Sequence, residues 1–433
     1  MEKFIIEGGT QLRGTVTPSG NKNAALPMIA ACLLTDQPVT LRNVPRIHDV
    51  DDMLALLASL GVEIRELSRH DLVLHARDVR TTELDRGLCL RIRASILFAG
   101  PMLARMGQIH LPPPGGDVIG RRRLDTHMHA LRALGAEIHV NDGFDLQTDG
   151  LRGKDVFLDE ASVTGTENVL MAAVLAKGTT IIRNAASEPH VQDLARLLNA
   201  MGARISGIGS NTYTIEGTGG DATSPLHGAE FEIGADYIET GSFIGLAAVT
   251  RGELLIRNAA PEHLRMVLLT FARLGIECQV RGNDVFVSSH QTLRVQNDLR
   301  DAVPTIADGI WPAFPTDLMS IALVTATQCE GTVLLWEKMF EGRMFWVDKL
   351  IGMGGRVILC DPYRAVVVGP SVLRAEPAGL PSPDIRAGMA LLLAALCARG
   401  QSTIGNIGQI DRGYERIEEK LQGLGARIER VTA

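Results

Sequence analysis

The chain has 433 residues, of which 45% are hydrophobic and 21% charged, as is typical of a globular protein with two or three domains. Its net charge of −7 argues against a nucleic-acid-binding surface, because a phosphate backbone is neutralised by a basic face. The six cysteines show no paired spacing, so we predict neither a zinc site nor a disulfide framework. We expect a cytoplasmic protein with reduced thiols.

The segment from Met1 to Gly9 mixes charged with apolar residues, and we expect a strand there and not a signal peptide. The most apolar run, 387–398, is shorter than the roughly 20 residues that a membrane-spanning helix needs. It predicts a buried core helix, and we expect no association with a membrane.

One module recurs six times: a helix of small apolar residues, a turn containing glycine, and a short β-branched strand. The copies run from Asn23 to Asn43, Ala94 to Leu111, Thr166 to Asn184, Thr240 to Asn258, Thr316 to Leu335, and Ala387 to Asn406. A second helix follows each copy and ends at a Leu-Gly or Met-Gly step, namely at Gly61, Gly135, Gly202, Gly275, Gly354 and Gly425. A glycine between a helix and a strand predicts a left-handed C-cap. The repeat is compatible both with six modules in a row and with two closed groups of three.

The first chemical motif precedes the first of these helices. Lys22 follows Ser19-Gly20-Asn21 and stands before the apolar stretch from Ala24 to Leu34, which predicts a helix N-terminus at the lysine. Such an N-terminus favours anions through its free amides and the helix dipole. The alternative is a surface lysine whose stem covers apolar neighbours.

The second motif is the segment from Gly115 to His127, which places Asp117 on a glycine-rich turn just before Arg121, Arg122 and Arg123. Glycines allow a strained or mobile turn, and guanidinium groups suit phosphate or carboxylate. The segment predicts an anion-binding loop, with a solvated surface loop as the alternative.

The third motif, Phe314-Pro315-Thr316-Asp317, braces a carboxylate at the start of another repeat helix. An ordinary N-cap is the alternative reading of Asp317. Charged residues also stand at other repeat boundaries: Arg93, Arg343, Asp384, Arg386 and Arg412. Each could form a surface ion pair worth less than about 1 kcal/mol. Their recurrence at these boundaries favours a shared functional role.

Together, Lys22-Asn23-Ala24-Ala25-Leu26-Pro27 and the second and third motifs resemble the enolpyruvyl transferases, a resemblance that extends to Leu424-Gly425-Ala426-Arg427-Ile428. It implies an α/β fold in the form of a two-domain inside-out α/β barrel, with three repeats in each domain, helices inside, sheets outside and the active site in the cleft between the domains. It further implies that 1–21 with 236–433 form one domain, which carries Asp317, Arg343 and Arg412, and that 22–235 form the other. The chain would cross near Gly20–Lys22 and near Gly234–Tyr237.

The resemblance implies that the enolpyruvyl group of phosphoenolpyruvate is transferred to the 3-hydroxyl of UDP-N-acetylglucosamine, without a metal or cofactor. Asp317 would be the base and Asp117 the acid, while Lys22, Arg122 and Arg412 would neutralise phosphoenolpyruvate. The remaining substrate contacts implied are Asn23, Arg93, Arg123, Leu124, Asp125, Thr126, Ser162, Val163, Met339, Arg343, Asp384 and Arg386.

The sequence departs from the family pattern at several of these positions. Most relatives carry a cysteine where this chain has Asp117, and a carboxylate is a poorer nucleophile, so we expect resistance to the epoxide fosfomycin. The other departures are Arg123 for proline, Thr164 for glycine, Tyr237 for arginine, Gly342 for asparagine and Gln409 for histidine.

These departures leave two alternatives open: a transferase for another nucleotide acceptor such as UMP, and a silent regulator that binds a nucleotide sugar. The lysine motif argues against the shikimate branch of the family. An anion clamp assembled from separate repeats argues against a helical scaffold.

Overall fold

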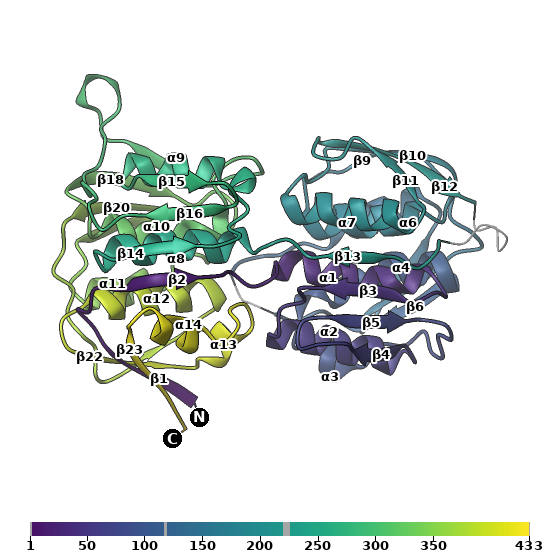
Figure 1. Cartoon of the computed structure of the whole chain (residues 1–433). Coiled ribbons are helices and arrows are strands. Elements are labelled where there is room, and N and C mark those ends of the chain that lie inside the picture. The colour runs from purple at the N-terminus through teal and green to yellow at the C-terminus, as the bar shows by residue number, and fades with distance from the viewer. Residues whose placement is uncertain (1, 117–118, 220–225, 433) are drawn as a thin grey trace. The chain divides into compact units, whose positions relative to one another are not determined.

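The computed structural model describes residues 2–116, 119–219 and 226–432 (Figure 1). It divides into two compact units. Unit 1 comprises Met1–Ser19, Val118–Arg121 and Ala235–Ala433, and unit 2 comprises Gly20–Asp117 and Arg122–Gly234. Each unit has its own hydrophobic core.

Unit 2 contains three sheets and three buried helices. The strand orders are β13(Glu230–Glu232)-β3(Val39–Arg42)-β5(Leu72–His75)-β4(Glu63–Glu66), β6(Gln108–Leu111)-β8(Phe144–Gln147)-β7(Glu137–Val140), and β11(Arg204–Ser206)-β12(Thr212–Thr218)-β10(Lys177–Arg183)-β9(Asp155–Phe157). The buried helices are α1 (Lys22–Ala31), the 3-10 helix η2 (Arg93–Phe98) continued by α4 (Ala99–Met106), and α6 (Val163–Ala173). The other helices described are α2 (His48–Ser59), α3 (Arg86–Cys89), α5 (Asp125–Ala133), α7 (Pro189–Ala200) and the 3-10 helix η1 (Cys32–Leu34).

Unit 1 repeats this plan. Its strand orders are β21(Leu380–Pro381)-β22(Gln401–Gly405)-β1(Glu2–Glu7)-β23(Arg427–Thr432), β15(Cys278–Arg281)-β16(Asp284–Val287)-β14(Glu253–Ile256)-β2(Arg13–Val16), and β17(Thr305–Ala307)-β18(Gly331–Trp336)-β20(Arg364–Gly369)-β19(Val357–Asp361). Its buried helices are α8 (Tyr237–Val249), the 3-10 helix η5 (Thr316–Leu318) continued by α10 (Met319–Ala326), and α12 (Ile385–Cys397). The other helices described are α9 (Arg265–Arg273), α11 (Val347–Gly352), α13 (Gly408–Asp411), α14 (Ile417–Gly423) and the 3-10 helices η3 (Pro261–His263) and η4 (Leu299–Asp301).

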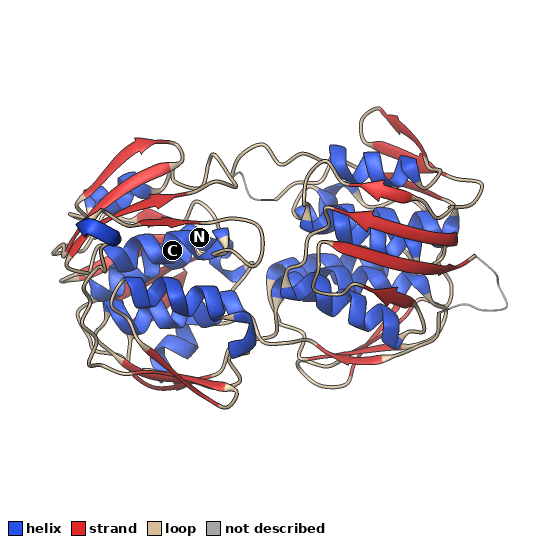
Figure 2. Ribbon diagram, turned by 90° about the horizontal axis from the view of Figure 1, so that it is seen from above, coloured by secondary structure: helices blue, strands red, loops and turns tan. Residues whose placement is uncertain are grey.

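In each unit the strands lie outside the buried helices (Figure 2). The predicted α/β fold with three repeats per group is therefore confirmed, as are the strand at the N-terminus and the buried helix in the apolar run. Small residues let the central helices approach closely: a Cβ atom on Gly245 of α8 would lie only 2.6 Å from Ile321 Cγ2 of α10. Within the described residues, no helix combines the length and apolar character needed to cross a membrane.

Left-handed residues mark the ends of the repeated elements. All six predicted glycines have positive φ, between 78° for Gly275 and 104° for Gly135, which confirms the C-caps. Asparagines after four of the strands, Asn43, Asn184, Asn258 and Asn406, also adopt positive φ, a conformation that asparagine tolerates better than most residues. The repeat therefore reproduces one local geometry at each of its turns.

Candidate functional site

The N-terminal ends of the buried helices carry most of the predicted site residues. These helices begin at Lys22 (α1), Arg93 (η2), Val163 (α6), Tyr237 (α8), Thr316 (η5) and Ile385 (α12). Side-chain oxygens of Asn21, Ser162, Asp236 and Asp384 cap four of them by accepting hydrogen bonds from amides of the first turn. Helix N-termini attract negative charge, so these ends suit anionic groups.

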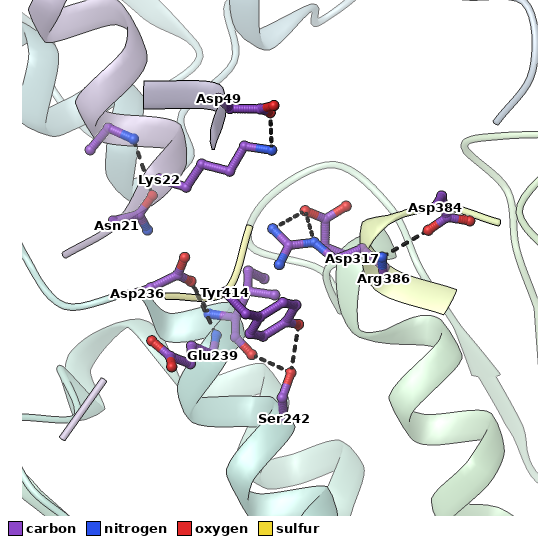
Figure 3. Close-up of polar contacts among 12 residues, drawn as sticks. Asn21, Lys22, Asp49, Asp236, Glu239, Ser242, Asp317, Asp384, Arg386 and Tyr414 are labelled. Carbon is purple, nitrogen blue, oxygen red and sulfur yellow. Dashed lines mark hydrogen bonds and ion pairs between the residues drawn. The ribbon is translucent and has the colours of Figure 1, made fainter. Parts of the chain in front are cut away.

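In unit 1 the structure brings Asp317 together with Arg343 and Arg386. The Asp317 carboxylate accepts from Arg343 Nη2 at 2.8 Å. It also accepts from Arg386 Nε at 3.0 Å and Nη2 at 2.8 Å (Figure 3). Both arginine side chains are buried, whereas that of Asp317 is 24% exposed. Burial opposes the charge of Arg386, but Asp317 holds the pKa of its guanidinium above the ordinary value. The carboxylate is thus fixed in orientation between two permanent cations while its side chain remains partly accessible.

Tyr414 and Ser242 extend this cluster, although neither was among the predicted site residues. The Arg386 guanidinium lies 5.4 Å from the centre of the Tyr414 ring, and the Tyr414 hydroxyl lies 3.0 Å from Ser242 Oγ (Figure 3). Burial, more than any other cause, raises the pKa of Tyr414. Tyr414 directly follows the sequence Asp411-Arg412-Gly413, and Ser242 contacts the Tyr414 hydroxyl from the buried helix α8. Nearness to a motif in the sequence was the one indication of a role for Tyr414.

Arg412 lies just after α13 and donates to Gln409 Oε1 at 3.0 Å. Gln409 is the position at which the family pattern has histidine. Gln409 therefore helps to orient Arg412, one of the residues predicted to neutralise phosphoenolpyruvate.

The turn that contains Met339 and Arg343 packs against residues 119–121 of the predicted anion-binding loop. The amide of Gly342 donates to the Ile119 carbonyl at 2.9 Å, and the Glu341 carboxylate accepts from the Arg121 amide at 2.7 Å. A Cβ atom on Gly342 would lie 2.7 Å from the carbonyl carbon of Ile119, closer than real Cβ contacts allow. The backbone in this conformation therefore leaves no room for a side chain at position 342, where the family pattern has asparagine.

In unit 2 the ammonium of Lys22 lies 2.6 Å from the carboxylate of Asp49 (Figure 3). The two residues are 7% and 3% exposed. Asp49 lies in the first turn of α2, and its pairing with Lys22 was not predicted. An acidic residue is common in the first turn of a helix, so the sequence alone does not distinguish this one. Asn23, the next residue of α1, is half-buried.

Arg93 and Arg122 bring two positive charges together. The guanidinium of Arg93 donates to the Arg122 carbonyl. Burial, and then the charge of Arg122, lower the pKa of Arg93 to about 10. A bound anion would favour the charged form of Arg93 and so offset both effects on its pKa. The glycines of the loop are also constrained by packing, because a Cβ atom on Gly115 would lie 1.8 Å from the Leu90 carbonyl oxygen.

The predicted substrate contacts from Arg123 to Thr126 lie at the start of α5. Leu124 is the N-cap residue of this helix and Asp125 its first residue. Arg123, which replaces a proline, pairs with Asp125 and Asp159 at 3.2 Å each. Thr126 donates to Asp159 at 2.6 Å. Ser162, close by in the sequence, caps α6, and Val163 is its first residue.

His127, the last residue of the second motif, is buried, and no role was predicted for it. Its Nδ1 accepts from Asn168 Nδ2 at 2.9 Å, so its proton is on Nε2 and is donated to Thr164 Oγ1 at 3.1 Å. The amide of Asn168 is oriented by the Gly100 amide, which donates to Oδ1 at 2.7 Å. Burial lowers the pKa of His127 to about 3, and the ring is neutral. Thr164 can then direct its hydroxyl proton to another acceptor.

Tyr237, which replaces an arginine, is buried in unit 1, with its ring edge-on to those of His263 and Trp311. Asp117, the predicted acid, lies outside the described residues. Across residues 2–116, 119–219 and 226–432, no group of three or more His, Cys, Asp or Glu side chains is arranged to hold a metal.

Two solved structures share this fold. The enolpyruvyl transferase NikO from Streptomyces tendae superposes with a TM-score of 0.86 at 23% identity, covering 100% of this chain and 99% of that chain. An EPSP synthase from Acinetobacter baumannii superposes with a TM-score of 0.75 at 17% identity, covering 100% of both chains. At these identities the likeness defines the class of fold, that of the enolpyruvyl transferases.

A family model described as EPSP synthase (3-phosphoshikimate 1-carboxyvinyltransferase) matches residues 6–421. Curated proteins named UDP-N-acetylglucosamine 1-carboxyvinyltransferase are more specific relatives. The chain is 59% identical to the protein of Bradyrhizobium diazoefficiens, over 99% of this chain and 98% of that protein. It is 54% identical to that of Treponema denticola, over 99% of each. The chain therefore belongs, within the EPSP synthase family, to the UDP-N-acetylglucosamine 1-carboxyvinyltransferases.

Proposed function

We propose that this protein transfers the enolpyruvyl group of phosphoenolpyruvate to the 3-hydroxyl of UDP-N-acetylglucosamine and releases phosphate. The observation that carries the proposal is the Asp317 carboxylate, fixed by Arg343 and Arg386 and partly exposed. A carboxylate held in this way can take a proton from a hydroxyl without reorganising. The names of the full-length relatives support the choice of acceptor.

In the proposed mechanism, Asp317 removes the proton of the 3-hydroxyl as its oxygen bonds to C2 of phosphoenolpyruvate. C3 takes a proton from the acid, Asp117, and a tetrahedral adduct forms. Loss of a proton from C3 and of phosphate from C2 then restores the double bond. Lys22, Arg122 and Arg412 neutralise the phosphate and carboxylate of phosphoenolpyruvate throughout.

We assign the nucleotide to residues near the start of the buried helices of unit 2. The adjacent charges of Arg93 and Arg122 favour a diphosphate, and Thr164 offers a hydroxyl donor oriented by His127. The remaining residues of this proposed subsite are Arg123, Leu124, Asp125, Thr126, Ser162 and Val163, whereas Asn23 would contact the sugar. We assign the sugar to Met339, Asp384 and Arg386 of unit 1. The reaction would be the first committed step of peptidoglycan precursor synthesis in the cytoplasm, and so serve wall growth, cell shape and division.

The test is phosphate release from phosphoenolpyruvate with UDP-N-acetylglucosamine, UMP or shikimate 3-phosphate as acceptor. We expect turnover only with the nucleotide sugar. Turnover with UMP would make the protein a transferase for another nucleotide acceptor. Binding of the nucleotide sugar without phosphate release from any of the three would favour the silent regulator.

We also predict that the protein resists fosfomycin and that the Asp117→Cys variant becomes sensitive. A thiolate opens the epoxide to form a stable C–S bond, whereas a carboxylate is a much weaker nucleophile. Activity should survive incubation with the drug in the wild-type protein and decay with time in the variant. Intact mass should show one added drug molecule on the variant only.

The exposed Cys360, present in both proteins, is an internal control for unspecific alkylation. Rapid inactivation of the wild-type protein, with an adduct mapped to the segment 115–120, would contradict the prediction.

A further inference from the structure

Unit 1 contains a buried pair of acidic residues that the proposed mechanism does not use. Asp308 follows strand β17, and Glu337 follows strand β18, which is paired with β17 in the same sheet. They are 2% and 0% exposed. Two buried carboxyl groups side by side are costly unless a proton or a cation is shared between them.

Glu337 binds two different segments. Its carboxyl oxygens lie 3.0 Å from the hydroxyl of Thr316, the residue before Asp317. Its Oε1 also accepts from the amides of Met339 and Phe340, both at 3.0 Å. One side chain thus ties the turn that carries Asp317 to the turn that leads to Arg343.

Asp308 also binds the turn that leads to Arg343, because its Oδ1 accepts from the Lys338 amide at 2.5 Å. Its other oxygen, Oδ2, is buried, and while both acids are ionised no donor in the described part of the chain bonds to it. A proton on Glu337 would complete the bonding of Asp308 Oδ2. Since two amides already occupy Oε1 of Glu337, that proton belongs on Oε2.

The charges around the pair favour the protonated form. Burial, followed by the adjacent Asp308, raises the pKa of Glu337 to about 8. Arg343, the cation that faces Glu337 from the following turn, opposes this rise and is the weaker influence. The Thr316 hydroxyl, contributed by η5, is uncharged, and the Lys338 ammonium lies over the exposed ring of Trp336, 4.5 Å from its centre.

We propose that Asp308 and Glu337 share a single proton and act as positioning residues, holding Asp317 and Arg343 in their mutual orientation. The effect on catalysis rests on the proposed function. The shared proton does not, because it is inferred from the burial and hydrogen bonds of Asp308 and Glu337. Loss of the proton places two negative charges in one buried site, and their repulsion loosens the Thr316 turn and the 338–340 turn together. Both partners of the Asp317–Arg343 pair then lose their support.

The test compares wild-type protein with Glu337→Gln between pH 6 and 9.5. The glutamine amide can donate permanently to Asp308, while its oxygen accepts from the Met339 and Phe340 amides. We expect wild-type kcat to fall above about pH 8 and the variant to keep its neutral kcat to within a few-fold without that fall. Glu216→Gln, at an exposed position of unit 2, is the matched control and should keep the wild-type profile.

Thermal unfolding detects the proton independently of catalysis. The folded pKa of Glu337 lies above its ordinary value of 4.5, so folded protein binds more protons than unfolded protein between about pH 4.5 and 8. Wild-type stability should therefore fall relative to Glu337→Gln as pH rises through this window, and the difference in Tm should level off above it. A Tm difference that does not vary with pH would overturn the shared proton.

A pH-dependent Tm difference together with identical pH profiles of kcat would overturn the positioning role alone. Should Glu337→Gln fail to fold, Asp308→Asn provides the same comparison, because its amide can donate to an ionised Glu337. If all acceptors prove inactive, the Tm comparison still decides whether the proton is shared.

Discussion

The Asp317→Asn variant is expected to lose about 10²–10⁴-fold in kcat for phosphate release, because a general base contributes a factor of this size. An amide cannot take the proton of the acceptor hydroxyl. Its nitrogen would also face one of the two guanidinium groups that now donate to the carboxylate, so some local disorder of Arg343 or Arg386 should accompany the loss.

The measurement is steady-state phosphate release, with calorimetric titration of UDP-N-acetylglucosamine to show that the variant still binds. Asp155→Asn is the matched control, since Asp155 also pairs with an arginine but is exposed on a strand of unit 2. Near-normal kcat in Asp317→Asn would remove this residue from the mechanism. A loss of binding as large as the loss of kcat would make its role structural.

The Asp49→Ala variant is expected to lower the free energy of unfolding by about 3–5 kcal/mol, because removing one partner of a buried ion pair leaves the other charge uncompensated. The ammonium of Lys22 is the charge left behind, with a side chain 9% exposed. Urea denaturation with two spectroscopic probes measures the change. On the same helix, Asp52→Ala breaks a pair with the exposed Arg91 and should cost less than about 1 kcal/mol.

The double variant Lys22→Met/Asp49→Leu separates stability from catalysis. Replacing both charges by apolar side chains is often neutral for stability, so the double variant should recover most of the loss. It should nevertheless remain inactive, because the proposed ligand of phosphoenolpyruvate is gone. Recovery of activity along with stability would restrict Lys22 to a structural role.

The repeated fold was predictable because its signals are local. A glycine at the end of each second helix, as at Gly61, and an asparagine after a strand, as at Asn43, report a backbone conformation that few residues tolerate. Small apolar residues in the central helices report burial on all sides. The grouping into three plus three was not encoded locally: it depends on which sheets close around which helices.

The candidate site was predictable to the extent that its residues stand in motifs at helix starts, as Lys22, Asp317 and Arg386 do. Their partners were not. Asp317 and Arg386 are 69 residues apart in the sequence, and His127 and Thr164 are 37 apart. No periodicity connects such pairs.

The sequence by itself determined the repeat, the elements that compose it and the residues at their N-termini, because each depends on neighbours within a few positions. Only the tertiary structure decided that Lys22 pairs with Asp49, that His127 is neutral, and that Glu337 lies against Asp308. These properties depend on burial and on charges brought together from distant segments, which shift a pKa or make a pair costly to break.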